Sequence, residues 1–98
     1  MGKDALLEPV DVAIIGAGMA GMSAAVYARL SGLSVRVFER HFLPGGLCTA
    51  WKRRGYVFDY CIDYFLGSRK GHAFYDIWKE LGIIGKTEFR HIESYGRF

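Results

Sequence analysis

The feature that most constrains this 98-residue chain is a glycine motif between a hydrophobic run and a small-residue segment. The motif, in the pattern G-x-G-x-x-G, is Gly16-Ala17-Gly18-Met19-Ala20-Gly21. Residues 10–15 before it form a β-branched run typical of a buried parallel strand, and residues 19–30 after it repeat apolar residues at helical spacing. Residues 34–39 alternate in the manner of a second strand. The pattern therefore predicts a β-α-β unit of an α/β fold.

Each glycine of the motif has its own reason to lack a side chain. Gly16 allows a tight turn from strand to helix, Gly18 lets a pyrophosphate approach the backbone, and Gly21 lets the helix lie close to the sheet. Unpaired N–H groups at the helix N-terminus attract the pyrophosphate, so the predicted cofactor-binding set also includes Ala20. Glu39 ends the second strand and would accept hydrogen bonds from the adenosine ribose. The alternatives are a strand-turn-helix without a ligand and, for Glu39, an exposed acid.

The acid at position 39 also bears on which dinucleotide binds. A carboxylate repels a 2′-phosphate, which disfavours NADP, although Arg40 directly after it weakens that exclusion. FAD and NAD both remain compatible with the first glycine motif.

A second motif follows the acid. Residues 45–46 are a glycine pair, and residues 56–59 read Tyr-Val-Phe-Asp. This combination resembles FAD-dependent oxidoreductases of the phytoene desaturase and amine oxidase superfamily, especially the carotenoid desaturase and isomerase branch, over residues 10 to 85. The resemblance implies that Gly45 and Gly46 lie beside the diphosphate and ribityl chain of the cofactor, because bare backbone can approach a bulky, charged group. It favours FAD over NAD.

Two positions depart from the family pattern. Leu47 stands where many members have an arginine that contacts the cofactor, and we keep it among the cofactor-binding positions without a charge to offer. Cys61 stands where a glycine often follows the Phe-Asp element, and we expect it to be a small buried residue. We expect the nearby aromatic side chains to pack in the core, with a channel for an elongated apolar substrate as the alternative that the resemblance suggests. They are Trp51, Tyr56, Phe58, Tyr60, Tyr64 and Phe65.

The rest of the chain predicts a hairpin strand over residues 54–59, a helix over residues 71–81 and a strand over residues 87–93. Residues 1–9 read as a leader, and residues 10–98 as the truncated N-terminal part of a Rossmann-like FAD/NAD(P)-binding domain. Such a domain needs further parallel strands. The β-α-β unit is therefore expected to be incomplete, and its apolar sheet edge to require a C-terminal domain or a partner chain.

The spacing of cysteine and histidine residues argues against a metal site, whereas the charge alone does not choose among an anionic ligand, a nucleic acid and an acidic membrane surface. The net charge of +3 rests largely on basic residues that we expect to be solvated, with a role near phosphates or lipid headgroups as the alternative. Those residues are Lys52, Arg53, Arg54, Arg69 and Lys70. The two cysteines and three histidines lack the spacing of a metal site. We expect no metal, no nucleic-acid partner and a cytoplasmic location, with peripheral membrane contact as a variant.

The functional hypothesis is the FAD-binding N-terminal portion of a flavin-dependent oxidoreductase that dehydrogenates or isomerises an apolar, polyene-like substrate. In such enzymes the flavin carries out the hydride chemistry and the protein positions it. No catalytic residue is identified, and we expect the chain alone to be inactive. The alternatives are a non-catalytic nucleotide-binding module that docks to a partner chain, and an NAD-binding domain.

Overall fold

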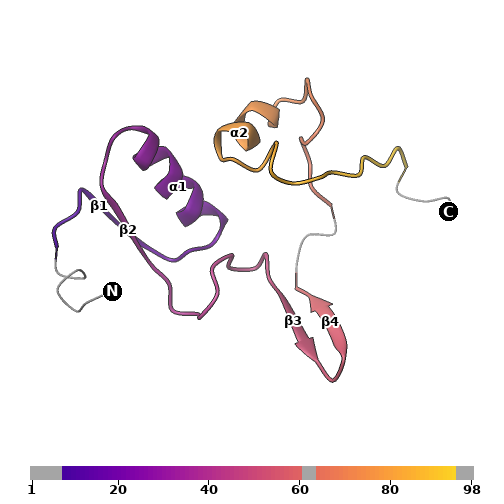
Figure 1. Cartoon of the computed structure of the whole chain (residues 1–98), viewed down its shortest axis with the longest axis horizontal. Coiled ribbons are helices and arrows are strands. Elements are labelled where there is room, and N and C mark those ends of the chain that lie inside the picture. The colour runs from indigo at the N-terminus through magenta and orange to yellow at the C-terminus, as the bar shows by residue number, and fades with distance from the viewer. Residues whose placement is uncertain (1–7, 61–63, 95–98) are drawn as a thin grey trace. The chain divides into compact units, whose positions relative to one another are not determined.

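The computed structural model describes residues 8–60 and 64–94 of the chain. Six elements follow one another (Figure 1). They are β1 (Val12–Ile15), α1 (Met19–Leu30), β2 (Val35–Phe38), β3 (Ala50–Arg53), β4 (Tyr56–Asp59) and α2 (Tyr75–Glu80). The chain divides into two compact units, residues 1–62 and residues 63–98. Residues 1–7 of the predicted leader, and Cys61, lie outside the described residues.

The first unit begins with the predicted β-α-β arrangement. β1 and β2 pair in parallel, from Val12 opposite Val35 to Ile15 opposite Phe38. α1 connects the two strands and contacts both of them (Figure 1). The Gly16 N–H donates a hydrogen bond of 2.7 Å to the Phe38 carbonyl, which extends the pairing one step past β1. The predicted α/β fold class, an incomplete Rossmann-like β-α-β unit, is confirmed.

α1 has the bounds expected from the sequence, because both of its ends have clear signals. After the helix, Gly32 adopts a φ of +83°. The Gly32 N–H donates to the Arg29 carbonyl at 3.0 Å, and the Leu33 N–H donates to the Ala28 carbonyl at 3.0 Å. These two hydrogen bonds form a Schellman motif, which satisfies carbonyls at the helix C-terminus.

A polar pair joins the starts of the two parallel strands. The Asp11 carboxylate accepts hydrogen bonds from the Ser34 N–H at 2.8 Å and the Ser34 hydroxyl at 2.6 Å. In return, the Asp11 N–H donates to the Ser34 Oγ at 2.9 Å. The hydrogen bonds to Ser34 lower the pKa of Asp11 below its usual value. This pair fixes the register at the end of the strands opposite the glycine motif.

A β-hairpin follows the second glycine motif. β3 and β4 pair in antiparallel register, from Ala50 opposite Asp59 to Arg53 opposite Tyr56. The turn between them is Arg54-Gly55, with φ of +50° and +85°, which is the pattern of a type I′ turn. The sequence predicted only a strand at residues 54–59, so β3 and the turn position were missed.

The second unit is built around the short helix α2, which is shorter than the predicted residues 71–81. The Trp78 indole N–H donates to the Leu66 carbonyl at 2.8 Å and so fixes the helix to the preceding loop. The strand predicted for residues 87–93 is wrong: only a single bridge between Ile84 and Thr87 forms. Its alternating pattern has no partner strand among the described residues of this unit, and a strand without a partner leaves its backbone groups unpaired.

Burial is low in the described part of the chain, where Ala17, at 4% exposure, and Gly67 are the buried residues. The expected aromatic core is wrong for five of its six residues, which are exposed, with Tyr56 at 70%; they are Trp51, Tyr56, Phe58, Tyr60 and Tyr64. Trp51 instead stacks on Phe58 at a ring-centroid distance of 6.0 Å on one face of the hairpin. Among the described helices, none is long and apolar enough to cross a membrane.

Candidate functional site

The turn between β1 and α1 has the geometry that the glycine motif predicts. Gly16 adopts a φ of +100°, a conformation that L side chains rarely adopt, and so turns the chain out of β1. Gly18 is the N-cap of α1 with extended backbone, and no side chain caps the helix there. The first turn of α1 also lacks an acidic residue. The N–H groups at this helix start are therefore available to an anion.

Gly21 is required by packing within the chain itself. A Cβ atom at this position would overlap the carbonyl oxygen of Gly16 and would lie 3.3 Å from the Ile14 Cγ2. The first turn of α1 thus lies directly against the strand-to-helix turn. This is the close helix–strand approach that the third glycine of the motif provides.

Gly18, by contrast, is not required by the chain's own packing or backbone. Its φ is −77°, which any residue adopts. A Cβ atom there would meet only the Gly46 Cα, at an ordinary contact distance of 3.8 Å. An alanine-sized side chain would therefore fit at position 18, at the end of α1 where no side chain caps the N–H groups.

The second glycine motif lies against the first. The Gly45 N–H donates a hydrogen bond of 2.7 Å to the Ala17 carbonyl. Gly45 and Gly46 both have positive φ, at +121° and +60°, and a Cβ atom on Gly46 would lie 3.0 Å from the Gly18 Cα. Two segments of bare backbone, separated by more than twenty residues in the sequence, therefore form one surface.

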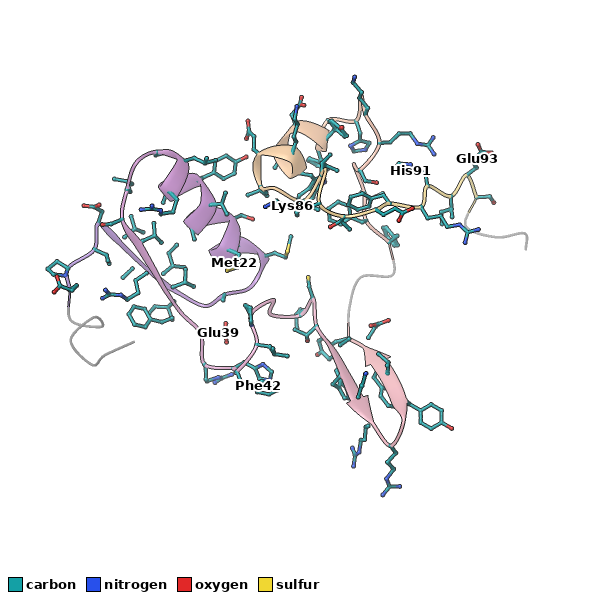
Figure 2. All side chains as sticks on the ribbon, in the orientation of Figure 1. Met22, Glu39, Phe42, Lys86, His91 and Glu93 are labelled. Carbon is teal, nitrogen blue, oxygen red and sulfur yellow. The ribbon has the colours of Figure 1, made fainter. Side chains whose placement is uncertain are left out.

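The Glu39 carboxylate joins the ends of the two strands at this surface (Figure 2). Its Oε2 accepts a hydrogen bond from the Ala17 N–H at 2.7 Å, and its Oε1 accepts one from the His41 N–H at 2.8 Å. These backbone hydrogen bonds, with that of His41 the larger cause, lower the pKa of Glu39 below its usual value. The carboxylate is anionic at neutral pH, and each oxygen retains a lone pair for a further donor such as a hydroxyl.

The remaining predicted positions are not joined to this surface by side-chain contacts. Ala20 lies in the first turn of α1 and is exposed. Arg40 and Leu47 are exposed as well, and in the described residues no side-chain hydrogen bond ties either of them to the glycine turns. Their roles toward a cofactor stay predictions.

Sequence reasoning missed Ala17 as the centre of the site. Its N–H binds Glu39, its carbonyl binds Gly45, and its side chain is buried. All of its polar contacts use the backbone, which any residue type supplies, so no residue pattern marks it. The one available signal is its position between two glycines, where a small side chain fits.

The described residues contain no group of three or more His, Cys, Asp and Glu side chains that could hold a metal ion. Cys48 is a half-buried free thiol on the loop that carries the glycine pair. The three histidines are exposed. Their ring nitrogens contact nearby backbone groups or, for His91, the Ser68 hydroxyl. The geometry thus offers an anion-binding surface and an acid, without a catalytic set.

Comparison with known proteins places this surface in a family context. Residues 14–81 match the model of the NAD(P)-binding Rossmann-like domain family. An inactive all-trans-retinol 13,14-reductase of Danio rerio is 33% identical over 91 residues, which are 89% of this chain and 15% of that protein. Prolycopene isomerase 2 of an Oncidium hybrid cultivar is 35% identical over 72% of this chain and 12% of its own length.

A third relative, the thioredoxin reductase of Ureaplasma parvum, is 59% identical over 39 residues, or 40% of this chain and 12% of its own length. The chain thus spans 15% or less of the length of these three relatives. The retinol reductases and prolycopene isomerases belong to the phytoene desaturase superfamily of FAD oxidoreductases, which confirms the resemblance seen in the two glycine motifs.

Proposed function

The chain belongs to the NAD(P)-binding Rossmann-like domain family, and from that membership we propose that it is the FAD-binding portion of a flavin-dependent oxidoreductase. In this proposal the surface formed by the two glycine motifs holds the diphosphate, and Glu39 holds the adenosine ribose. The chain's part in the reaction is to bind and orient the cofactor.

One observation carries the proposal: the glycine at position 18 is unexplained by the chain itself. Gly16 is explained by its positive φ, and Gly21 by its contact with the Gly16 carbonyl. Gly18 has neither reason, yet it lies at the start of a helix whose first N–H groups no side chain caps. A ligand that approaches the backbone closely and carries negative charge accounts for both features.

The residues present fit the adenosine diphosphate half of FAD. Bare backbone at Gly18 and Gly46 leaves room for phosphate oxygens, and the anionic Glu39 accepts hydrogen bonds from ribose hydroxyls. When bound, the flavin ring supplies the hydride chemistry of the enzyme. We assign no catalytic residue to this chain.

FAD is preferred to NAD in this proposal because of the second glycine pair. The contact of Gly45 and Gly46 with the first motif extends the bare surface beyond what a single G-x-G-x-x-G turn provides. NADP is disfavoured because a 2′-phosphate would meet the Glu39 carboxylate, whose lowered pKa keeps it charged.

The relatives suggest the class of substrate. Their names specify all-trans-retinol and prolycopene, and on this basis we propose an apolar polyene substrate that is dehydrogenated, saturated or isomerised. Apolar substrates of this kind partition into membranes. We therefore propose a cytoplasmic chain that works at a membrane surface.

Equilibrium dialysis of the purified chain against FAD, NAD and NADP tests the cofactor assignment. We expect FAD to bind most tightly, because Gly45 and Gly46 extend the bare surface toward its ribityl chain, yet weakly enough to be lost on gel filtration, because we assign no contact with the flavin ring to the described residues. Gly18→Val should lower the FAD affinity at least about tenfold by blocking the diphosphate, or about 1.4 kcal/mol. Tighter binding of NAD than of FAD, or unchanged FAD affinity in Gly18→Val, would refute the assignment.

A docking role is the second candidate, and the sheet favours it. Within residues 8–60 and 64–94, β1 and β2 form a two-stranded sheet in which each strand has one edge without a pairing strand, and Ile15 is 85% exposed. Unpaired edges and exposed apolar side chains favour association with another polypeptide. Co-expression with the remainder of a flavoprotein subunit, followed by gel filtration, should then give a stable heterodimer, and two separate peaks would exclude this role.

A further inference from the structure

The second unit contains an open hollow that the dinucleotide site does not use. Its volume is roughly 600 Å³, and residues 64–69, His72 and residues 89–93 line it. Hollows of about 300–1,000 Å³ suit small organic molecules. All of these lining residues belong to the second unit, so the hollow is independent of the β1–α1 turn.

The apolar wall of the hollow is aromatic and well anchored. The rings of Phe65 and Phe89 stack at a centroid distance of 5.3 Å, with 28° between their planes. Phe65 also contacts the Trp78 ring at 4.7 Å, and the Trp78 indole is hydrogen-bonded to the Leu66 carbonyl. The wall therefore offers a flat apolar surface whose position is fixed by α2.

Two further contacts hold the lining of the hollow in place. Gly67 is buried with a φ of +90°, and a Cβ atom there would lie 2.7 Å from the Phe74 Cβ, so the first lining segment lies close to the start of α2. The Ser68 Oγ and the His91 Nε2 lie 3.1 Å apart and form a hydrogen bond between the two lining segments. These contacts, with the Phe65–Phe89 stack, form the hollow from side chains of this unit alone.

The residues that line the hollow include two guanidinium groups and one carboxylate. Arg69 and Arg90 come from the two different segments, and neither guanidinium forms an ion pair with a carboxylate of the described residues. The carboxylate is Glu93, which lies close to His91 along the C-terminal segment (Figure 2). Guanidinium groups bind carboxylates and phosphates through paired hydrogen bonds.

We propose that this hollow is a second binding site, which takes a small organic anion with a flat apolar body. The apolar body would lie on the Phe65–Phe89 wall, and its carboxylate or phosphate would pair with Arg69 and Arg90. Both halves of the ligand are required, because the aromatic wall supplies burial and the guanidinium groups supply charge.

Titration of the ¹⁵N-labelled chain with 2-naphthoate, followed by NMR, tests this site. Naphthoate should shift the amide signals of residues 64–72 and 89–93, while 2-naphthalenemethanol and acetate, which each lack one half of the ligand, should bind at least about tenfold more weakly. Arg90→Gln should weaken naphthoate binding about tenfold. The matched control Arg54→Gln removes a cation from the β3–β4 turn and should leave the affinity unchanged.

Three outcomes would overturn the proposal. The first is equal binding of naphthoate and the neutral alcohol, which would indicate adsorption to exposed apolar surface. The second is an equal loss of affinity in Arg90→Gln and Arg54→Gln, which would indicate a non-specific effect of net charge. The third is a set of shifts centred on residues 16–21, which would place the anion at the dinucleotide surface. Unchanged signals of α2 in Arg90→Gln establish that the variant is folded.

Discussion

Replacement by alanine should have different effects at the two glycines near the N-terminus of α1: Gly18→Ala should lower FAD affinity, and Gly21→Ala should lower stability. Gly21→Ala places a methyl group onto the Gly16 carbonyl oxygen and 3.3 Å from the Ile14 Cγ2. Gly18→Ala places it 3.8 Å from the Gly46 Cα, at ordinary contact distance, on backbone that alanine accepts. The pair therefore separates a glycine needed for folding from a glycine needed for a ligand.

The magnitude at Gly21 follows from two opposed terms. Alanine in place of glycine in a helix stabilises it by about 0.5–1 kcal/mol. Overpacking costs about 1–3 kcal/mol, and the upper part of that range applies because the overlapped atom is a backbone oxygen that cannot rotate away. We expect Gly21→Ala to lower the free energy of unfolding of the first unit by about 1–2 kcal/mol, and Gly18→Ala to change it by less than about 0.5 kcal/mol.

Urea unfolding followed by circular dichroism at 222 nm, with hydrogen exchange of the α1 amides as a local measure, gives both values. FAD affinity is measured on the same samples. We expect Gly18→Ala to retain its helix and lose affinity, and Gly21→Ala to lose helix protection. A Gly21→Ala variant as stable as the wild type would refute the close packing of α1 on the turn, and with it the separation of roles.

Three further predictions concern the acid and the second unit. Glu39→Gln should reduce the protection of the Ala17 and His41 amides from hydrogen exchange, because glutamine has one acceptor oxygen where two N–H groups now bind the carboxylate. Full protection of both amides in the variant would show that the acid does not hold the β1–α1 turn. In the wild type the pKa of Glu39 is lowered from its usual value of 4.5. The protection of both amides should therefore be complete above pH 4.5 and should decline as the pH falls through the lowered pKa of the folded state. Protection that does not change with pH down to about pH 2 would contradict this prediction. Gly67→Ala should destabilise the second unit by about 1–3 kcal/mol, because the positive φ of Gly67 and its closeness to Phe74 both disfavour a side chain at this position. An unchanged urea unfolding transition, followed by Trp78 fluorescence, would show that the loop adapts to the side chain.

The sequence was most informative where backbone conformation demands a particular residue. The bounds of α1 follow from the glycines at 16 and 32, since the positive φ of Gly16 turns the chain out of β1 and Gly32 ends the helix in a Schellman motif. The two parallel strands were predicted one or two residues too long, because Asp11, Ser34 and Glu39 flank the ladder and form side-chain hydrogen bonds there without joining its register. Local signals thus located the β-α-β unit well.

Tertiary contacts account for the failures. Residues 87–93 alternate like a strand, but Phe89 stacks on Phe65 and no partner strand forms among the described residues of that unit. The aromatic residues of β3 and β4 have core composition, yet the hairpin stacks Trp51 on Phe58 and leaves both exposed. The residues next to an aromatic residue in the sequence do not determine which surface covers its side chain.

The residues of the candidate site also differ in whether the sequence could predict them. The turn at Gly16 and the close packing at Gly21 could be predicted because they depend on residue type, while the roles of Gly18 and Glu39 toward a cofactor stay predictions. The role of Ala17 could not be predicted, because it acts through its N–H and carbonyl groups. The family resemblance implied that Gly45 and Gly46 lie beside the cofactor, but their contact with the first glycine motif was not predicted, because spacing along the chain does not determine it.

The central claim is that the surface formed by the two glycine motifs receives a diphosphate, and ADP tests it most directly because it is the half of FAD that this surface fits. A titration of the ¹⁵N-labelled chain with ADP should shift the amide signals of residues 16–21 and 39–46, and Gly18→Val should abolish those shifts. Shifts that lie elsewhere, or that persist in Gly18→Val with the same affinity, would contradict the account.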